Sequence, residues 1–400
     1  MTEWTMIRLR DACNSVDYGL TASASSKETG TRFLRITDIV GDSFSWNDVP
    51  FVAVSEGQVE RYRVSPGDIV IARTGATTGV SRWLDTVPSD AVFASYLVRL
   101  KISDRYDSRF IGYALKGGQF WDYVRGVLGD KSAQPNASAT TLVAAPLSVP
   151  SDIAEQRRIA GVLGALDDKI AANERIAVTA LDLAESRYRA AADSDSWRAV
   201  TLGSAARWLS GGTPKTSESS YWGGGIPWIS ALSLKSPWID DSDRKLTDLG
   251  SVSGTRMVPA ETIIFVVRGS SLKSEFRVGI TQCEVAFGQD CKALIPDASI
   301  DPNLLFHAVR SNTSKIMEMV DETSIGAGRL STDLISKLEV RVPEMRDDPT
   351  AAELRMLNEL AAGRQRESRA LALLRDALLP QLMSGKLRVR DAEKIVEDAV

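Results

Sequence analysis

Apolar and polar residues follow two kinds of pattern along this chain. In residues 1–150 and 193–343, short runs of branched and aromatic residues, typical of strands, alternate with loops rich in Ser, Thr and Gly. The expected strands are Phe33–Ile36, Asp68–Ala72, Tyr96–Ile102 and Ala145–Pro150 in the first region and Thr262–Val267 and Leu338–Val342 in the second. The expected helices are Phe110–Val124, interrupted at Gly117-Gly118, and Asn303–Val320. The pattern therefore predicts two mixed α/β modules.

Each module is followed by a segment with helical periodicity. From Asp152 to about Ala192 there is no proline, and this predicts one amphipathic helix of about 40 residues, or ~60 Å. A second helix is expected from about Thr350 to Leu379, where Pro380 should end it before a short extension. The apolar positions that recur along the two helices are Ile159, Val162, Leu166, Ile170 and Leu181, and Leu354, Leu357, Leu371, Leu374 and Leu378. Helices this long are typical of a coiled coil, and their apolar positions could serve pairing within the chain or partner docking.

The two halves of the chain repeat each other about 193 residues apart. The matched positions include Trp4 with Trp197, Leu9 with Leu202, Ile36 with Ile229, Gly67 and Asp68 with Ala260 and Glu261, Ile71 with Ile264, Arg99 with Lys292, and Pro150 with Pro343. The sequence thus predicts an α+β protein in which two similar modules are separated by two long antiparallel helices, with pseudo-two-fold symmetry. Such an object suits a ligand with two half-sites, and duplex DNA is the obvious candidate.

Composition and charge narrow the function without deciding it. The chain has 400 residues and a formal net charge of −4, and residues 1–150 carry as many basic as acidic side chains. The basic footprint usual for nucleic-acid binding is therefore missing, so phosphate contacts would have to come from local patches or from a partner. Three scattered cysteines, and no apolar run long enough for a signal peptide or membrane span, predict a cytoplasmic protein without membrane association.

The chain also lacks the motifs of an enzyme. The single histidine, His307, lies in an expected helix and is interpreted as a packed or surface residue, and no metal-ligand spacing occurs. There is no Gly-x-x-x-x-Gly-Lys-Ser/Thr loop, no Gly-x-Gly-x-x-Gly loop and no Asn-Pro-Pro-aromatic string. We therefore expect no catalytic residues, no metal and no cofactor in this chain.

Several strings in this order resemble the DNA-specificity subunits of type I restriction–modification systems. They are Ser210-Gly-Gly-Thr-Pro-Lys215, Tyr221-Trp222-Gly-Gly-Gly-Ile-Pro-Trp-Ile229, Ala133-Gln-Pro-Asn136, Leu147-Ser-Val-Pro150, Glu155-Gln-Arg-Arg-Ile159 and Leu378-Leu-Pro-Gln-Leu-Met-Ser-Gly385. The chain departs from the pattern because the first module lacks Gly-Gly-Thr-Pro and the second has Gly326-Ala-Gly328 in place of Gln-Pro-Asn.

The resemblance implies a non-catalytic DNA-recognition subunit. It implies target-recognition domains at 1–150 and 193–343, a spacer helix at 151–192, and a second spacer helix with a C-terminal extension at 344–400. Each domain would read one half of a bipartite double-stranded DNA target, and the helices would set the gap and dock two methyltransferase subunits. Motor–nuclease subunits would join for cleavage, and S-adenosylmethionine, ATP and Mg²⁺ would belong to these partners.

Candidate DNA-contacting residues lie in polar loops that differ between the modules, because modules that read different half-sites should differ there. One pair of loops offers Arg73, Thr74, Thr77 and Thr78 in the first module and Arg268, Ser270, Ser271 and Lys273 in the second. Another offers Lys27, Thr29 and Arg32, and Thr213, Lys215 and Tyr221. A third offers Lys131, Gln134 and Asn136, and Arg329. Arginine can read guanine, and Gln or Asn can read adenine.

Each candidate has a structural alternative. The loops could be ordinary surface turns, Tyr221 and Trp222 could anchor a packed loop, and Gln134 and Asn136 could cap a turn. At the level of function, the chain could be a structural adaptor that binds proteins and has no DNA specificity. A self-contained methyltransferase or nuclease is a third class, against which the missing motifs argue.

Overall fold

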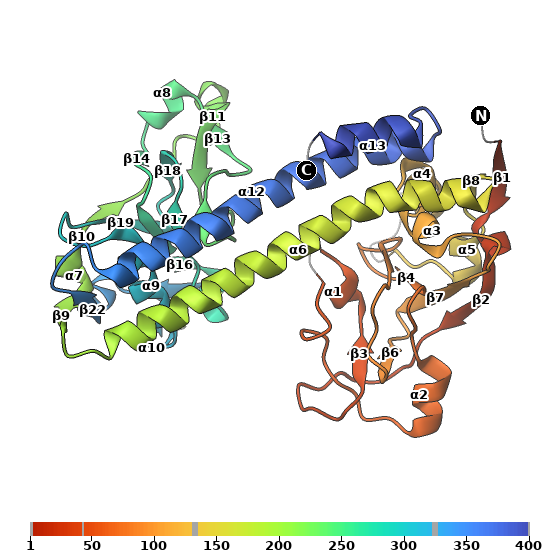
Figure 1. The fold of residues 1–400 in the computed structure, drawn as a ribbon, viewed down its shortest axis with the longest axis horizontal. Coiled ribbons are helices and arrows are strands. Elements are labelled where there is room, and N and C mark those ends of the chain that lie inside the picture. The colour runs from red at the N-terminus through yellow and green to blue at the C-terminus, as the bar shows by residue number, and fades with distance from the viewer. Residues whose placement is uncertain (1–2, 42–43, 130–134, 322–326, 399–400) are drawn as a thin grey trace. The chain divides into compact units, whose positions relative to one another are not determined.

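The computed structural model describes residues 3–41, 44–129, 135–321 and 327–398, and these form two compact units (Figure 1). Unit 1 contains the residues up to Ala171 and those from Ser368 onward, and unit 2 contains Ala172–Glu367. Two long helices, α6 (Ile153–Ala192) and α12 (Pro349–Met383), contribute one part to each unit.

Unit 1 is built around a four-stranded sheet of order β2-β7-β4-β5, in which all pairs are antiparallel. A two-stranded ribbon, β1-β8, and a parallel pair, β3-β6, complete its strands. Its strands are β1 Trp4–Arg8, β2 Cys13–Tyr18, β3 Arg32–Leu34, β4 Ile69–Ala72, β5 Ser81–Trp83, β6 Ala91–Phe93, β7 Leu97–Ile102 and β8 Pro146–Pro150. Its shorter helices are η1 Leu9–Ala12, α1 Ile36–Ile39, α2 Glu56–Tyr62, α3 Ser108–Ala114, α4 Gly118–Leu128, α5 Ala139–Val143 and α13 Val389–Glu397.

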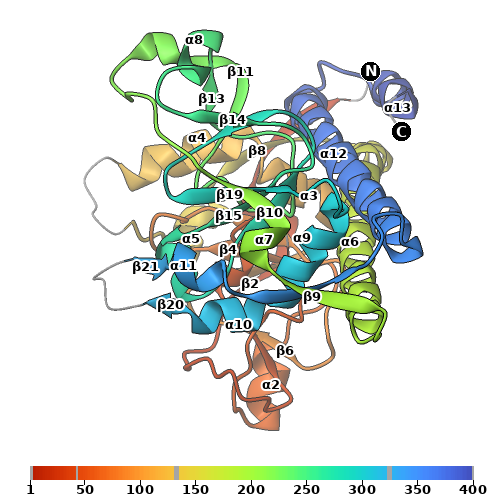
Figure 2. The same cartoon turned by 90° about the vertical axis from the view of Figure 1, so that its left-hand side faces the viewer.

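Unit 2 has a five-stranded sheet of order β10-β19-β15-β17-β12, against which α9 packs (Figure 2). Smaller sheets have the orders β13-β11-β18-β14, β16-β21-β20 and β22-β9. Its strands are β9 Trp197–Thr201, β10 Ala206–Ser210, β11 Trp222–Ile229, β12 Trp238–Ile239, β13 Lys245–Leu246, β14 Arg256–Val258, β15 Ile263–Val266, β16 Arg268–Gly269, β17 Val278–Thr281, β18 Val285–Phe287, β19 Cys291–Pro296, β20 Val320–Asp321, β21 Gly328–Leu330 and β22 Glu339–Pro343. Its shorter helices are α7 Leu202–Ala205, η2 Ser219–Tyr221, α8 Asp248–Ser251, η3 Ser270–Lys273, α9 Pro302–Ser311, α10 Thr313–Glu318 and α11 Thr332–Ile335.

The strand pairing confirms the internal repeat. β1 pairs with β8 so that Trp4 faces Pro150, and β9 pairs with β22 so that Trp197 faces Pro343. The order β2-β7-β4-β5 of unit 1 recurs as β10-β19-β15-β17 in unit 2. Both modules therefore fold by the same scheme.

The spacing of about 193 residues that the sequence predicts between matched positions does not hold inside the modules, however. Leu34 accepts a backbone hydrogen bond from Ala94, and the equivalent bond in unit 2 runs from Gly288 to Ile229. Ile229 therefore corresponds to Leu34 rather than to Ile36. By the same comparison of strand registers, Arg99 corresponds to Ala293 rather than to Lys292. The loops between strands differ in length by a few residues, so the offset drifts and returns to its starting value only at the outer strands.

The sequence located most elements but not all their ends. Four predicted strands of the first module form, as β3, β4, β7 and β8, and Gly117-Gly118 separates α3 from α4 as expected. Pro380 does not end α12, which continues to Met383. Proline removes one backbone hydrogen bond, but the extra turn buries Leu382 completely in the core of unit 1. The segment after Gly385 is more than an extension, because α13 forms there with Val389 and Ala392 buried.

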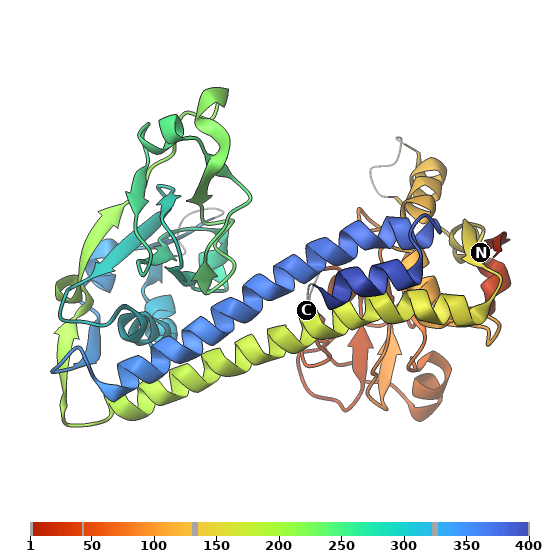
Figure 3. The same cartoon turned by 45° about the horizontal axis from the view of Figure 1, so that its top comes forward.

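Helices α6 and α12 pack together and run antiparallel (Figures 1 and 3). Arg187 pairs with Glu353 at 2.9 Å in unit 2, and Asp167 pairs with Arg375 at 2.7 Å in unit 1. The recurrent apolar positions lie in the cores of the units, and three of them are only half-buried. The buried ones are Ile159, Val162, Leu166, Leu371 and Leu378 in unit 1 and Leu354 and Leu357 in unit 2, and the half-buried ones are Ile170, Leu374 and Leu181. Among the described residues, no helix is both long and apolar enough to cross a bilayer.

Candidate nucleic-acid interface

Two of the three candidate loops of the first module meet at the end of β4. Thr74 and Asn136 are bridge partners, and the Ala137 N–H donates to the Arg73 carbonyl at 2.8 Å. The backbone therefore joins loop 73–79 to the segment that begins at Pro135. Asn136 is exposed and Thr74 is half-buried, so both border the surface at one edge of the module.

The second module repeats this edge with different side chains. β16 and β21 pair so that Arg268 faces Arg329, and the Leu330 N–H donates to the Val267 carbonyl at 2.9 Å. Arg268 and Arg329 thus occupy the places of Thr74 and Asn136. The true equivalent of Arg73 is the buried Val267, because an insertion shifts the register by one residue.

The two arginines of this edge form a like-charge pair that is only partly compensated. Arg268 and Arg329 are both exposed, and neither side chain makes a hydrogen bond or ion pair with a described residue. Like charges directly opposite each other on antiparallel strands cost ~0.2–1 kcal/mol. Asp321 lies across from Arg329 on β20 and offsets part of the charge on one side only. An anion bound over the edge would remove the repulsion.

Arg73 has a different environment. Its side chain is half-buried and stacks on Tyr18, with Cζ 5.0 Å from the ring centroid. Tyr18 lies on β2, 55 positions earlier in the chain, so sequence reasoning missed it. Tyr18 ends β2, and β7 separates β2 from β4, the strand that Arg73 follows, so no signal in the sequence indicated that the two side chains meet.

The remaining residues of these two loops divide into exposed and structural ones. Thr78 is 3% exposed, and its hydroxyl donates to Gly75 O at 2.7 Å, so it holds the turn and does not offer itself to a ligand. Thr77 is half-buried. In the second module Ser270 and Lys273 are exposed on η3, whereas Ser271 is half-buried. Lys131 and Gln134 lie outside the described residues.

The loop that contains Lys27, Thr29 and Arg32 is tied to the segment after residue 46. The Thr29 hydroxyl donates to Val52 O at 2.7 Å, and Arg32 Nη1 donates to Val49 O at 2.6 Å. The Arg32 guanidinium also stacks on the Phe51 ring at 4.1 Å. Arg32 is therefore committed within the module, while Lys27 is exposed.

In the second module the corresponding loop is a packed anchor, as the structural alternative proposed. Trp222 and Trp228 stack edge to face at 5.3 Å, and Arg244 covers Trp222 at 3.7 Å. Trp222 Nε1 donates to the Lys215 carbonyl at 3.2 Å, which fixes the loop. Arg244 was not identified from the sequence. Thr213 and Tyr221 are half-buried beside this cluster, and the Lys215 side chain is exposed.

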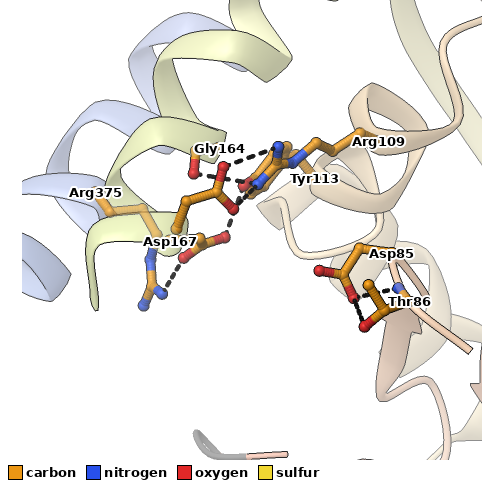
Figure 4. Close-up of polar contacts among 8 residues, drawn as sticks. Asp85, Thr86, Arg109, Tyr113, Gly164, Asp167 and Arg375 are labelled. Atoms are coloured by element: carbon orange, nitrogen blue, oxygen red, sulfur yellow. Dashed lines mark hydrogen bonds and ion pairs between the residues drawn. The ribbon is translucent and has the colours of Figure 1, made fainter. Parts of the chain in front are cut away.

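Polar contacts fix the first module to both long helices inside unit 1 (Figure 4). Arg109 on α3 pairs with Asp168 of α6 at 2.7 Å, and the Tyr113 hydroxyl donates to Asp167 at 2.6 Å. Arg375 of α12 pairs with the same Asp167. Burial would raise the pKa of Asp167, but Lys116, Tyr113 and Arg375 together hold it below its ordinary value. Asp167 is therefore a charged junction of three helices.

The second module is fixed to α12 by a buried set of neutral groups and by an ion pair between Arg355 of α12 and Asp301 at the start of α9. His307 is completely buried, and its Nε2 contacts Asn358 Oδ1 at 3.2 Å. Asn358 Nδ2 donates to Asn303 Oδ1 at 2.9 Å. Burial lowers the pKa of His307 to about 3, so the imidazole is neutral, and it is a packed residue as interpreted from the sequence.

Comparison with known proteins finds relatives both in sequence and in fold. The chain is 27% identical over 174 residues to the type I restriction enzyme EcoR124I/EcoR124II specificity subunit of Escherichia coli, covering 42% of this chain and 43% of that protein. It is 25% identical over 353 residues to the type I restriction enzyme MjaIX specificity subunit of Methanocaldococcus jannaschii, covering 82% and 77%. The first match thus spans less than half of that relative.

The solved structure of a type I restriction–modification S subunit from M. genitalium matches with a TM-score of 0.61 at 17% identity, over 95% of this chain and 96% of that chain. No family model matches the chain. The resemblance to type I specificity subunits is confirmed in sequence, and the fold is theirs.

Proposed function

We propose that this chain is the DNA-recognition subunit of a type I restriction–modification complex. Residues 1–150 and 193–343 are its two target-recognition domains, and each reads one half of a bipartite target. Helices α6 and α12 set the gap between the half-sites and dock two methyltransferase subunits, and motor–nuclease subunits join for cleavage. The chain itself is not an enzyme, and S-adenosylmethionine, ATP and Mg²⁺ act in the partners.

The observation that carries this proposal is an edge common to both modules, where the loop after the central strand pairs with the segment that begins at residue 135 in the first module and with β21 in the second. The backbone pairs Thr74 with Asn136 in one module and Arg268 with Arg329 in the other. The scaffold is the same, but amide and hydroxyl groups are exchanged for two guanidinium groups. Recognition of two unlike half-sites requires this combination, because base edges are read by side chains presented from a fixed backbone.

The electrostatics of the edge agree with a polyanionic ligand. The chain is acidic overall, with a net charge of −4. An opposed pair of arginines that make no ion pair with a described residue is then a local exception that folding alone does not reward. Phosphate groups neutralise such a pair, and a shared grip with the methyltransferase subunits supplies the rest of the affinity.

The test is selection of a DNA motif. The purified complex of this chain with its methyltransferase subunits is incubated with a library of random duplexes, and the bound fraction is sequenced. We expect two short blocks of specified bases at a constant separation. Enrichment of no motif would contradict DNA recognition and favour an adaptor that binds only proteins. A single continuous block would contradict the division into two half-sites.

The spacer role has its own test. Seven residues are inserted into α6 after Ala171 and seven into α12 after Glu367, which lengthens each helix by ~10 Å. The gap between the two blocks should grow by about three base pairs, because base pairs are ~3.4 Å apart. A selected motif with an unchanged gap would mean that the helices do not set the distance.

A further inference from the structure

The Arg73 guanidinium is held on two sides. Its Cζ lies 5.0 Å from the centroid of the Tyr18 ring, and its Nε donates to the Ala137 carbonyl at 3.4 Å. Nη1 and Nη2 make no hydrogen bond with any described residue, and the side chain is half-buried. The stack and the Nε contact therefore fix the plane of the group and leave its two terminal nitrogens for a ligand.

Tyr18 is itself fixed. It is the last residue of β2, and its backbone pairs with Val98 on β7. Its hydroxyl accepts the Ala139 N–H at 2.9 Å, which ties the ring to the start of α5. Although 46% of the residue is exposed, the ring is held at both ends and cannot turn away from Arg73 without breaking that bond.

We propose that Tyr18 is a positioning residue that orients Arg73 to read one guanine in the half-site of the first module. The inference rests on the proposed function and adds a base and a second residue to it. A guanidinium that donates two parallel bonds matches N7 and O6 of guanine in the major groove. An arginine side chain otherwise samples many rotamers. Because Tyr18 restricts the Arg73 side chain before DNA binds, less conformational entropy is lost on binding.

The second module lacks this device. Val267 stands in the place of Arg73, and Ser210 stands in the place of Tyr18. Ser210 instead accepts a hydrogen bond from Lys292 Nζ at 2.6 Å. A guanine preference that depends on a stacked arginine is therefore expected in the first half-site only.

The experiment compares motifs selected by complexes that carry Tyr18→Leu, Tyr18→Phe, Arg73→Lys or both Tyr18→Leu and Arg73→Lys. Tyr18→Leu removes the stack and should lower the preference for guanine at one position of one block by about tenfold. Arg73→Lys keeps the charge but loses the planar fork, and it should act at the same position. Tyr18→Phe keeps the stack and should retain most of the preference. The double variant should lose no more than Arg73→Lys alone.

Tyr106→Leu is the matched control. Tyr106 also lies beside an arginine, with Arg105 Cζ 5.9 Å from its ring, but it follows the far end of β7. It should leave the motif unchanged. The second block, read by the other module, reports whether each variant complex is intact.

Two results overturn the inference. The first is an intact guanine preference in Tyr18→Leu, and the second is an equal loss at every position of both blocks. Either would leave the proposed function standing, because the wild-type motif would still be bipartite. A wild-type complex that enriches no motif would overturn the proposed function and this inference together.

Discussion

Replacing Arg268 by glutamine is expected to stabilise unit 2 and to weaken its hold on DNA. Arg268 on β16 faces Arg329 on β21, both are exposed, and neither is paired with a described carboxylate. Removing one charge should recover the ~0.2–1 kcal/mol that opposed like charges cost. For a unit of this size that energy raises Tm by roughly 1–3 °C.

Salt and a second substitution identify the source of the gain. Near 1 M salt the screening length falls to ~3 Å, so the difference between Arg268→Gln and the wild-type protein should vanish there. Arg329→Gln should gain less, because Arg329 also faces Asp321. The double variant should gain no more than Arg268→Gln alone, since either change removes the repulsion.

The assay pairs thermal unfolding with DNA titration at several salt concentrations. Binding should weaken, and the salt slope should fall by ~0.9 if Arg268 contacts one phosphate, or the preference at one base should relax if it reads that base. A lower Tm at low salt, additive gains in the double variant, or unchanged DNA binding would each refute the reasoning.

Three further predictions concern the anchors and one turn. Asp167→Asn should lower the unfolding free energy of unit 1 by ~1–3 kcal/mol in urea, because it weakens the bonds to Tyr113 and Arg375. The pKa of Asp167 in the folded protein is below its ordinary value, so its contribution to the unfolding free energy is complete above pH ~4 and is lost as the pH falls through the folded pKa. The unfolding free energy of the variant should therefore not show this decrease at acidic pH. His307→Gln should flatten the pH dependence of the unfolding free energy of unit 2. In the folded protein the buried His307 has a pKa of about 3 and stays neutral, whereas in the unfolded chain it takes up a proton below pH ~6.5, so the wild-type unfolding free energy should fall by ~1.4 kcal/mol per pH unit below that pH. Equally steep pH profiles for the wild-type protein and the variant would contradict this. Glu261 has φ of 64°, so Glu261→Gly should raise the unfolding free energy by ~0.5–1 kcal/mol while Glu261→Ala, which keeps the strain, should not.

The sequence predicted the scaffold well because many positions of the repeat lie in the cores of the units or pack against them. Trp4 and Trp197 fix the outer strands of their modules in the same register, so their spacing could be read directly. Inside the modules, loop lengths differ, and a constant offset misassigned Ile229 by two residues. A strand register is decided by backbone pairing across the sheet, which a single sequence does not display.

The C-terminal end of α12 and the segment after it show why local sequence signals did not suffice to predict where the helices end. Pro380 is a strong stop signal, but the burial of Leu382 outweighs the loss of one backbone bond. The α13 segment is rich in charges, and its buried Val389 and Ala392 become visible as a helical face only against the core of unit 1.

For the candidate interface, the sequence predicted which loops are involved but not which side chains lie next to one another. Polar composition identified the segments around Arg73 and Arg268, but it did not show that Arg73 aligns with the buried Val267. The partners that define each site come from distant strands, as Tyr18 does for Arg73. Such pairs require the fold before they can be recognised.

The central claim is that each module reads its own half of one target. The most direct measurement compares the motifs selected by complexes carrying Arg73→Ala and Arg268→Ala with the wild-type motif. The account predicts that one variant relaxes bases in one block and the other variant relaxes bases in the second block, with the gap unchanged. Changes that fall in the same block for both variants, or in both blocks for either one, would contradict it.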